Sequence, residues 1–416
     1  MKIAILNNLY QFGGAETVAR QVYEGVRQAG HEAHYYVAFG PVIPKGIYSF
    51  YPKILTRLSH TRFNVWVERV FPRLSWCEPR FRKLAASDYD VIHLHSFHAN
   101  YVSLEALAFL AKHKPLVWTF HSYWGITGGC DPPLDCRRFM EQCGQCPQVG
   151  KWPIGAVDRT GEELRRKIQV LGPAPIHVVS PSQHLAKTVR ESRVGRRWAM
   201  HVIPNGVSAA RFTGARKRDA DFRSRLGLQP DALVILAVTR NFLDVDKGFG
   251  MIREALVDSA SAATQVVLAG QNSDVAAREL AGYHACHSAG YVENAVRLAE
   301  YYEAADIFLF ASSSENFPCV ILEAMAGACC VVATPTGGVV EQIEHGKSGL
   351  LAASISGKAL GETLRLALGR PERIRQIGAA ARMRVQDCFS EERMIRAHLE
   401  LYQKLVPTDV KKCVTD

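Results

Sequence analysis

The sequence lacks a long uncharged apolar stretch. None of its 416 residues falls in a window that resembles a membrane-spanning helix. The apolar run near the amino terminus covers residues 3–6 only, because Asn7 and Asn8 interrupt it before the hydrophobic region of a signal peptide could form. We therefore expect a cytoplasmic protein whose eleven cysteines are mostly reduced.

An excess of acidic residues is also missing. The chain has 50 Lys and Arg against 40 Asp and Glu, and this net charge of +10 favours anionic partners such as nucleotides or lipid phosphates. We recognise no nucleic-acid-binding motif, so nucleic acid is not an expected partner. With 48% hydrophobic and 22% charged residues, the composition is typical of a well-packed globular protein.

The dinucleotide-binding pattern G-x-G-x-x-G does not follow the first predicted strand. The turn there contains Gly13 and Gly14 and leads into a helix predicted from Glu16 to Gly30. This argues against a nicotinamide enzyme. A glycine pair lets the backbone approach a ligand closely, but a tight turn alone also requires glycine, so both interpretations stay open.

Short β-branched runs alternate with helical patterns throughout the chain. Near-continuous apolar strands that alternate with helices predict parallel sheets covered on both faces. The sequence therefore predicts an α/β protein with two doubly wound, Rossmann-like domains that face each other across a cleft. Their predicted bounds are residues 1–198 and 199–385, followed by a C-terminal helix over 386–416 that packs back on the first domain. Ligands of such sheets bind at the carboxyl ends of the strands.

A basic and aromatic segment, at about residues 51–87, interrupts this alternation. It is rich in Arg, Trp and Phe and has one acidic residue among its first twenty-five. One interpretation is a surface that contacts anionic lipid headgroups. The other is a helical insertion with buried aromatic side chains and solvated arginines.

Metal-binding patterns are weak. The D-x-D match at Asp244 and Asp246 recurs at residues 88–90 and 219–221, so it predicts no metal site. A loop over residues 130–146 contains four cysteines with the spacing C-x5-C-x6-C-x2-C, which are Cys130, Cys136, Cys143 and Cys146. Four thiolates could hold a structural zinc ion. Free thiols or disulfides remain alternatives because the first pair is loosely spaced.

Two cations flank a loop of the second domain. Arg240 is predicted at the end of a strand, and Lys247 is predicted just before a helix. They could neutralise a leaving diphosphate in place of a divalent metal. The alternative is an ordinary solvated loop.

The stretch over residues 312–338 contains Glu315 and Glu323 with seven residues between them. Pro318 suits the first position of a helix, which places Asn316 near the N-cap, and the free N–H groups of a helix start can bind phosphate. Glu323 would lie about 7.5 Å beyond Pro318 along that helix, at about 1.5 Å per residue. The two carboxylates could therefore face different parts of one extended ligand. Alternatively, Glu315 complements the helix dipole and Glu323 is a surface acid.

The same stretch, which ends in TPTGG, resembles together with the residues up to 351 the donor-binding signature of family 4 glycosyltransferases, which are retaining enzymes of the GT-B fold. Further motifs occur in the order of that family, and the resemblance covers essentially the whole chain: GGAE at 13–16, VSPSQHLA at 179–186, IPNGV at 203–207 and DKG at 246–248. The run from residue 116 to 153, with its His-x-x-Trp and Thr-Gly-Gly-Cys motifs, is similar to colanic-acid and exopolysaccharide glycosyltransferases.

This resemblance implies a hexosyltransferase that moves a hexose or deoxyhexose from a UDP- or GDP-sugar to a lipid-linked oligosaccharide acceptor in bacterial exopolysaccharide synthesis. It implies no required metal or cofactor, and it implies peripheral contact with the anionic inner face of the cytoplasmic membrane. The alternatives are another GT-B enzyme, such as a sugar-nucleotide epimerase, a disaccharide synthase or a phosphorylase, or a scaffold without catalysis.

The resemblance also assigns roles to single residues of the second domain. Glu323 would bind the ribose hydroxyls and Glu315 the hydroxyls of the transferred sugar. The backbone amides of Asn316 and Phe317 would support the sugar and phosphates, and Gly338 belongs to the donor-binding run.

Three further parts of the chain receive roles in the same way. Lys247, together with Arg240, would stabilise the diphosphate, although these two residues are further apart than in most members. The loop at Gly13 and Gly14 would close over the diphosphate, and His121 would contact the donor sugar near the reacting carbon. The retaining chemistry of the family needs no carboxylate nucleophile, so Glu315 would act by positioning and electrostatics.

Overall fold

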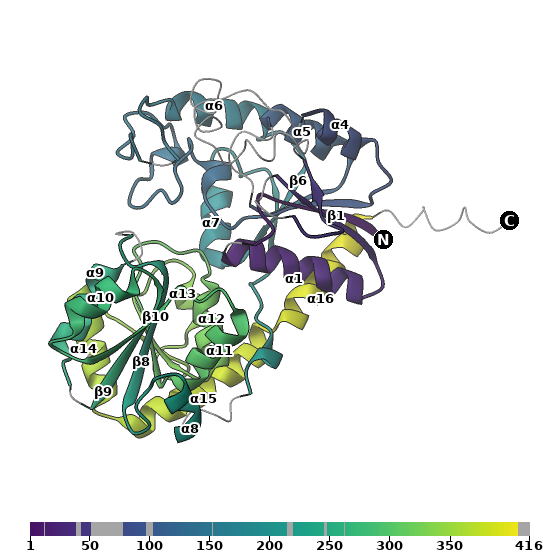
Figure 1. Cartoon of the computed structure of the whole chain (residues 1–416). Helices are drawn as coiled ribbons and strands as arrows, with labels where there is room; N and C mark the ends of the chain where they lie inside the picture. The colour runs from purple at the N-terminus through teal and green to yellow at the C-terminus, as the bar shows by residue number, and fades with distance from the viewer. Residues whose placement is uncertain are drawn as a thin grey trace. The chain divides into compact units, whose positions relative to one another are not determined.

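The computed structural model describes most of the chain in two compact units. The described residues are 1–11, 13–38, 43–50, 78–96, 103–151, 153–213, 219–244, 248–261 and 263–406. The first unit comprises Met1–Pro204 with Met394–Asp416, and the second comprises Asn205–Arg393. Each unit is a parallel sheet with helices packed against it (Figure 1).

The first unit is built on a seven-stranded sheet with the order β3-β2-β1-β4-β5-β6-β7. Its strands are β1 (Lys2–Asn7), β2 (Glu32–Val37), β3 (Tyr48–Ser49), β4 (Val91–Leu94), β5 (Leu116–Thr119), β6 (Ile176–Ser180) and β7 (Ala199–Val202). Every residue of β4 and β5 is buried, as expected of central strands covered on both faces.

The boundary between the two units differs from the prediction. The sequence assigned residues 199–202 to the second domain, whereas the structure pairs this strand, β7, in parallel with β6 of the first sheet. The chain leaves the first unit only after Pro204. Strand pairing decides the membership of this segment, and a single apolar run does not reveal its partner.

Helices of the first unit follow its strands in the expected alternation. They are α1 (Gly14–Gln28), α4 (Glu78–Ala85), α5 (Leu104–His113), α6 (Thr160–Val170) and α7 (Gln183–Glu191), with the single turns η1 (Trp124–Ile126) and η2 (Arg138–Met140). Helix α1 begins two residues before the predicted Glu16, because Thr17 already donates its N–H to the carbonyl of Gly13 at 3.0 Å.

The last helix, α16 (Glu391–Leu405), belongs to the first unit from Met394 onward. It packs closely on α1, since a Cβ on Gly25 would come within 2.3 Å of Ile395. Its Tyr402 hydroxyl hydrogen-bonds with Nδ1 of His93 on β4 at 2.6 Å. The first contact attaches the end of the described chain to α1, and the second attaches it to the first sheet.

The basic and aromatic segment at 51–87 lies mostly outside the described residues. Its described end contains α4, where Phe81 and Leu84 are buried while Arg80 and Arg82 are exposed. In this part, the aromatic side chain is core and the arginines are solvated. Within the described residues, no helix combines the length and apolar character needed to cross a membrane.

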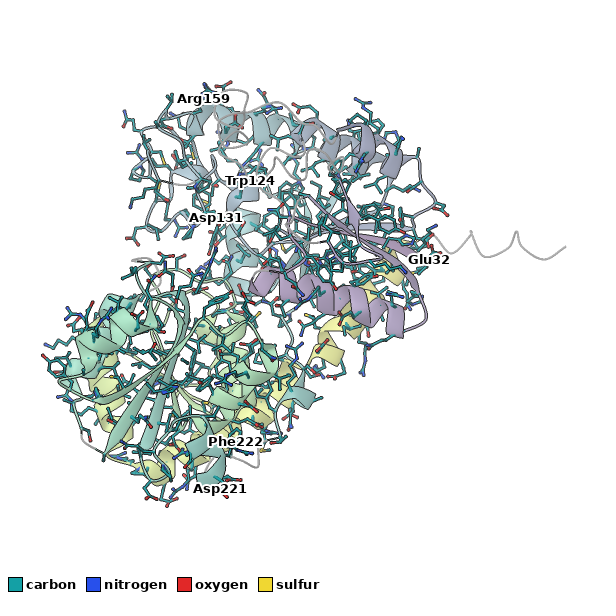
Figure 2. The ribbon with its side chains drawn as sticks, in the orientation of Figure 1. Glu32, Trp124, Asp131, Arg159, Asp221 and Phe222 are labelled. Carbon is teal, nitrogen blue, oxygen red and sulfur yellow. The ribbon has the colours of Figure 1, made fainter. Side chains whose placement is uncertain are left out.

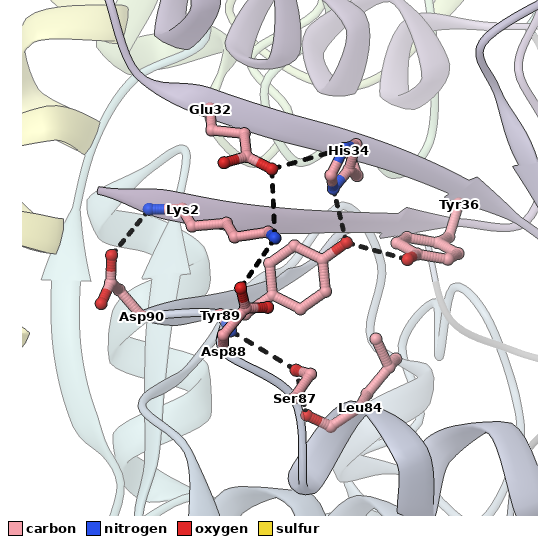
Figure 3. A network of polar contacts seen from close by, with 9 residues as sticks. All are labelled: Lys2, Glu32, His34, Tyr36, Leu84, Ser87, Asp88, Tyr89 and Asp90. Carbon is pink, nitrogen blue, oxygen red and sulfur yellow. Dashed lines mark hydrogen bonds and ion pairs between the residues drawn. The ribbon is translucent and has the colours of Figure 1, made fainter.

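A polar network joins the amino ends of β1 and β2 to the chain that enters β4 (Figure 3). The Lys2 ammonium contacts Asp88 at 2.9 Å and Glu32 at 3.1 Å, and the Lys2 backbone N–H donates to Asp90 at 2.6 Å. Ligands of parallel sheets bind at the opposite, carboxyl edge. The D-x-D match at 88–90 therefore has a structural role.

The second unit is built on a six-stranded parallel sheet with the order β10-β9-β8-β11-β12-β13. Its strands are β8 (Leu233–Asn241), β9 (Thr264–Gln271), β10 (Ala285–Gly290), β11 (Ile307–Phe310), β12 (Cys330–Ala333) and β13 (Leu350–Leu351). Its helices are α8 (Ala220–Arg225), α9 (Phe249–Asp258), α10 (Ser273–Leu280), α11 (Ala295–Ala304), α12 (Cys319–Ala326), α13 (Val339–Gln342), α14 (Gly357–Leu368) and α15 (Pro371–Cys388), with the turn η3 (Ala209–Arg211).

The sheet of the second unit has a hydrophobic core on each face. Neighbouring residues of β8 contribute to different cores: Val234 packs into the core on one face of the sheet, and Ile235 packs into the core on the opposite face. Cys329 and Cys330 are fully buried and serve as small core residues.

A buried ion pair braces the start of this unit. Arg223 of α8 donates to the Asp306 carboxylate at 2.8 Å, and both side chains are almost fully buried. Asp219 caps the same helix by accepting from the N–H of Phe222, which Figure 2 labels beside Asp221. The D-x-D match at 219–221 thus has a structural role as well.

Candidate functional site

The two glutamates of the second unit lie on either side of the start of α12. Pro318 is the N-cap, with an extended ψ of 124°, and the helix begins at Cys319. The prediction that Pro318 is the first helical residue is therefore wrong by one position, because its carbonyl is already the first acceptor and receives the N–H of Ile321. Glu315 lies in the preceding loop, and Glu323 is the fifth residue of the helix.

Threonines that follow β12 hold the loop on which Glu315 lies. The Thr334 hydroxyl accepts from the N–H of Ser312 and donates to its carbonyl, both at 3.1 Å. The Thr336 hydroxyl donates to the carbonyl of Ser313 at 3.2 Å. The threonines of the TPTGG motif thus fix the backbone that leads into Glu315.

The glycines of the same motif allow a close backbone approach. Gly337 has a φ of +50°, and a Cβ there would lie 1.7 Å from the carbonyl oxygen of Glu315. The N–H of Gly338 donates to that same oxygen at 3.4 Å. Any side chain at 337 would displace Glu315, so Gly337 positions this carboxylate through its backbone.

Two buried amides anchor the start of α12. Asn205 Nδ2 donates to the carbonyl of Phe317 at 2.9 Å, and Gln342 Nε2 donates to the carbonyl of Pro318 at 3.0 Å. No role was predicted for these amides, although Asn205 belongs to the IPNGV motif. Their contacts with the start of α12 can be seen only in the folded structure, since both residues lie far from α12 in the chain.

Glu323 is a half-buried residue whose carboxyl group is enclosed. Burial raises the pKa of this carboxyl to about 7, while the Tyr302 hydroxyl and the Arg211 cation oppose the shift. That hydroxyl approaches the carboxyl without making a regular hydrogen bond to any residue in the described part of the chain. The carboxylate therefore carries a desolvation cost that hydroxyl donors on a ligand would offset.

The Cys319 thiol, at the first residue of α12, lies within electrostatic range of both glutamates. Burial, followed by the charges of Glu323 and Glu315, raises the pKa of this thiol to about 12. Both carboxylates thus act on the same sulfur at the first residue of α12. The predicted amide donors, Asn316 and Phe317, lie between Glu315 and this helix start.

The loop after β8 approaches the same region. Gly248, the N-cap of α9, has a φ of +72°, and a Cβ there would lie 2.4 Å from the carbonyl of Ala311 at the end of β11. Arg240 is the penultimate residue of β8 and is exposed. Lys247 lies outside the described residues, so its predicted role stays a prediction.

In the first unit, Gly13 is the N-cap of α1 and has an extended φ of −158°, and Gly14 is the first residue of that helix. The pair follows the carboxyl end of β1, which is the edge where ligands of parallel sheets bind.

His121, which is half-buried and follows β5, lies beside two buried histidines at the end of β4, His93 and His95. Its Nε2 hydrogen-bonds with Nδ1 of His95 at 3.1 Å, and His93 bonds through its Nε2 with the Thr119 hydroxyl at 2.7 Å. Burial lowers the pKa of His121 to about 4 and the pKa values of His93 and His95 well below their usual range. The predicted sugar contact is therefore a neutral imidazole. No role was predicted for His93 and His95, although alternate histidines at a strand end are visible in the sequence.

The four cysteines of the loop after η1 gather around one small pocket. All four are free thiols. Among the residues that the structure describes, however, no three His, Cys, Asp or Glu side chains are already arranged as ligands of a metal ion.

Comparison with known proteins relates both units to one kind of enzyme. Residues 12–211 match the family described as Glycosyltransferase Family 4, and residues 232–369 match the family described as Glycosyl transferases group 1. The chain is 25% identical over 432 aligned positions to the putative colanic acid biosynthesis glycosyl transferase WcaC of Escherichia coli (strain K12), covering 96% of this chain and 100% of that protein.

Solved structures agree on the fold. Sucrose-phosphate synthase from Thermosynechococcus elongatus superposes with a TM-score of 0.71 at 21% identity, over 97% of this chain and 98% of its own. Anabaena HepE in complex with UDP-glucose gives a TM-score of 0.67 at 18% identity, over 97% of this chain and 100% of its own. The chain therefore belongs to the family 4 and group 1 glycosyltransferases and has the GT-B type of fold.

Proposed function

We propose that this protein is a retaining, metal-independent hexosyltransferase that transfers a hexose or deoxyhexose from a UDP- or GDP-sugar to a lipid-linked oligosaccharide acceptor. Its place would be in exopolysaccharide synthesis, at the inner face of the cytoplasmic membrane. Similarity to the putative colanic acid enzyme over almost the whole chain supports this pathway class. The fold relative that was solved with UDP-glucose supports a nucleotide sugar as donor.

The observation that carries the proposal is the pair of glutamates at the start of α12. A carboxylate accepts hydrogen bonds from two neighbouring hydroxyls, which suits Glu323 to a ribose and Glu315 to a hexose. The helix start between them, with Asn316 and Phe317, offers amides to the phosphates. Arg240 and Lys247 would offset the charge that develops on the leaving diphosphate.

Transfer with retention would proceed by attack of the acceptor hydroxyl on the face that the diphosphate leaves. The bond from the anomeric carbon to the phosphate oxygen breaks, the bond to the acceptor oxygen forms, and the leaving phosphate takes the acceptor proton. Glu315 and His121 would then orient the sugar, and neither would need to act as base.

Titration calorimetry tests the assignment of Glu323. We expect Glu323→Ala to weaken donor binding about 10- to 100-fold, because hydrogen bonds to a charged group contribute about 1.5–3 kcal/mol. Glu293→Ala, which removes an exposed acid of the same unit, is the control and should bind donor normally. Unchanged affinity in a folded Glu323→Ala protein would remove the ribose assignment.

The activity itself is tested in two steps. A panel of UDP- and GDP-sugars is first screened for the donor that raises the melting temperature, since a ligand of the native state stabilises it. With that donor, we expect release of nucleoside diphosphate only when a lipid-linked acceptor is present. Epimerised donor without an acceptor, or sugar transfer that depends on inorganic phosphate, would instead identify one of the other GT-B enzyme types.

A further inference from the structure

The loop between η1 and α6 contains a small pocket whose lining is dominated by sulfur. Cys130, Cys136, Cys143 and Cys146 all line it. The interior measures about 10 Å³, which is roughly the room that one water molecule needs. Cys130 is buried, the other three are half-buried, and all four are free thiols. Four thiols around a space of this size have the ligand number and chemistry of a tetrahedral site for one soft divalent cation.

The C-x-x-C turn at 143–146 is held in place although it contains no helix or strand. Gly144 and Gln145 both have positive φ, 127° and 50°. The Arg138 guanidinium donates to the carbonyls of Gly144 at 2.8 Å and of Gln145 at 3.2 Å. Asp158 accepts from the N–H of Cys146 at 2.7 Å. A non-glycine residue in the left-handed region costs about 1 kcal/mol or more, so this turn persists because several groups fix it.

The turn also packs directly on the start of α6. A Cβ on Gly161 would lie 2.8 Å from the carbonyl of Cys143, and a Cβ on Gly128 would lie 2.4 Å from the carbonyl of Thr160. This close approach brings the positive end of the α6 dipole beside the sulfur-lined pocket, where it favours negative charge.

A buried cation reinforces that preference. Lys167 of α6 is 1% exposed, and its ammonium donates to the carbonyls of Trp124 and Thr127. It lies 3.8 Å from the centre of the Trp124 ring, which Figure 2 labels on this segment. The Glu163 carboxylate is within electrostatic range of this ammonium, and so are the Cys130 and Cys143 sulfurs. Buried charges need compensation, and a tetrathiolate metal complex with a net charge of −2 would supply it.

We propose that Cys130, Cys136, Cys143 and Cys146 bind one Zn²⁺ as a structural tetrathiolate site. Each thiol releases one proton to solvent and forms one Zn–S bond, with no change in oxidation state. Among the described residues the four sulfurs do not converge as ligands around one point, so metal binding closes the pocket. The required movement is local, because Cys136, Cys143 and Cys146 lie on irregular backbone.

The site would stabilise the segment that follows His121. Asp131 comes directly after Cys130 and accepts the N–H of Tyr123 at 2.9 Å, two residues beyond His121. A metal ion at Cys130 would therefore fix both ends of the segment that connects β5 with the cysteine loop.

Metal analysis of the full-length protein, purified without chelator after growth with added zinc, tests the proposal. We expect close to one zinc per chain by mass spectrometry of the metal. The double variant Cys143→Ser, Cys146→Ser should lose this zinc. Cys388→Ser removes an exposed thiol on α15 and is the matched control, which should keep it.

Two measurements on the unmodified protein keep the proposal falsifiable if the double variant fails to fold. Replacement of zinc by Co²⁺ should give sulfur-to-cobalt charge-transfer absorption together with visible bands of a tetrahedral ion. Thiol titration of the native protein should find four more reactive thiols after the metal is removed. Less than about half an equivalent of zinc, full zinc content in a folded double variant, or a protein mass that is lower by four hydrogens because of two disulfides would overturn the proposal.

Discussion

Replacing Glu323 by glutamine should make the protein more stable and a weaker binder of its donor. Burial raises the pKa of this carboxyl from 4.5 to about 7. A raised carboxyl pKa means that the folded state holds a proton that the unfolded state has lost between these two values. Stability therefore falls as the pH rises through this window, and the full cost remains above pH 7.

The shift sets the size of the effect. A difference of about 2.5 pKa units corresponds to about 3 kcal/mol at 1.36 kcal/mol per unit. Because Glu323 keeps some solvent exposure, we expect about 1–2 kcal/mol of this cost in practice. Glutamine has nearly the same shape and no charge, so Glu323→Gln should gain that amount at pH 8. At pH 4.5 most of the gain should vanish, because the wild-type carboxyl is then largely protonated in the folded protein.

Urea unfolding of the wild type and of Glu323→Gln, each at pH 8 and pH 4.5, measures how much the free energy of unfolding changes at each pH. All six tryptophans precede residue 205, so tryptophan fluorescence follows the first unit, whereas far-UV circular dichroism follows both. The gain should appear only in the dichroism transition. Glu293→Gln should change the free energy of unfolding by less than about 0.5 kcal/mol at either pH. An equal gain at both pH values, or none at pH 8, would show that the Glu323 carboxylate is well solvated.

Three further outcomes follow from the geometry. Gly337→Ala should destabilise the second unit by about 2–4 kcal/mol in urea, because a Cβ would lie 1.7 Å from the Glu315 carbonyl, whereas Gly250→Ala on α9, with open space around its Cβ, should be neutral or stabilising. His121→Gln should lower kcat about 100-fold with little change in donor affinity by calorimetry, and an unchanged kcat would exclude a role in transfer. Burial lowers the pKa values of His121 and His398 to about 4. Because the unfolded state then binds more protons between pH 6.5 and pH 4, stability of the first unit, followed by tryptophan fluorescence, should fall as the pH falls through that window.

The alternation of apolar strands and helices was enough to predict both parallel sheets, because central strands such as β4, β5 and β11 are buried along their whole length. It did not reveal which sheet receives the strand at 199–202, since that depends on pairing with β6. The start of α12 was misplaced by one residue, because proline is compatible with both the N-cap and the first helical turn, and only the ψ of Pro318 distinguishes them.

Some site residues could likewise be predicted from the sequence, whereas others could not. The glutamates were found because both lie in one short stretch of the sequence, Glu315 in the loop before α12 and Glu323 on that helix. Asn205, Gln342 and Thr334 were assigned no role, since their contacts with the loop before α12 join residues that are 22 or more positions apart. Polar residues that brace a backbone carry no local pattern, and only the folded chain brings them together.

These bracing contacts explain how an unfavourable carboxylate can persist at Glu323. If α12 could rotate or its first turn could unwind, the carboxyl would reach solvent and recover most of its hydration. The amides of Asn205 and Gln342 hold the carbonyls at the start of the helix, and Gly337 holds the backbone of Glu315 before it. The desolvation cost is therefore present in the free protein, and a ligand that supplies hydroxyl donors lowers it without reorganising the site. Because the site is preorganised in this way, ligand binding does not have to offset the entropy cost of ordering the protein. The TPTGG and IPNGV motifs are then part of the donor site through the carbonyls that they hold, even if their side chains do not touch the donor.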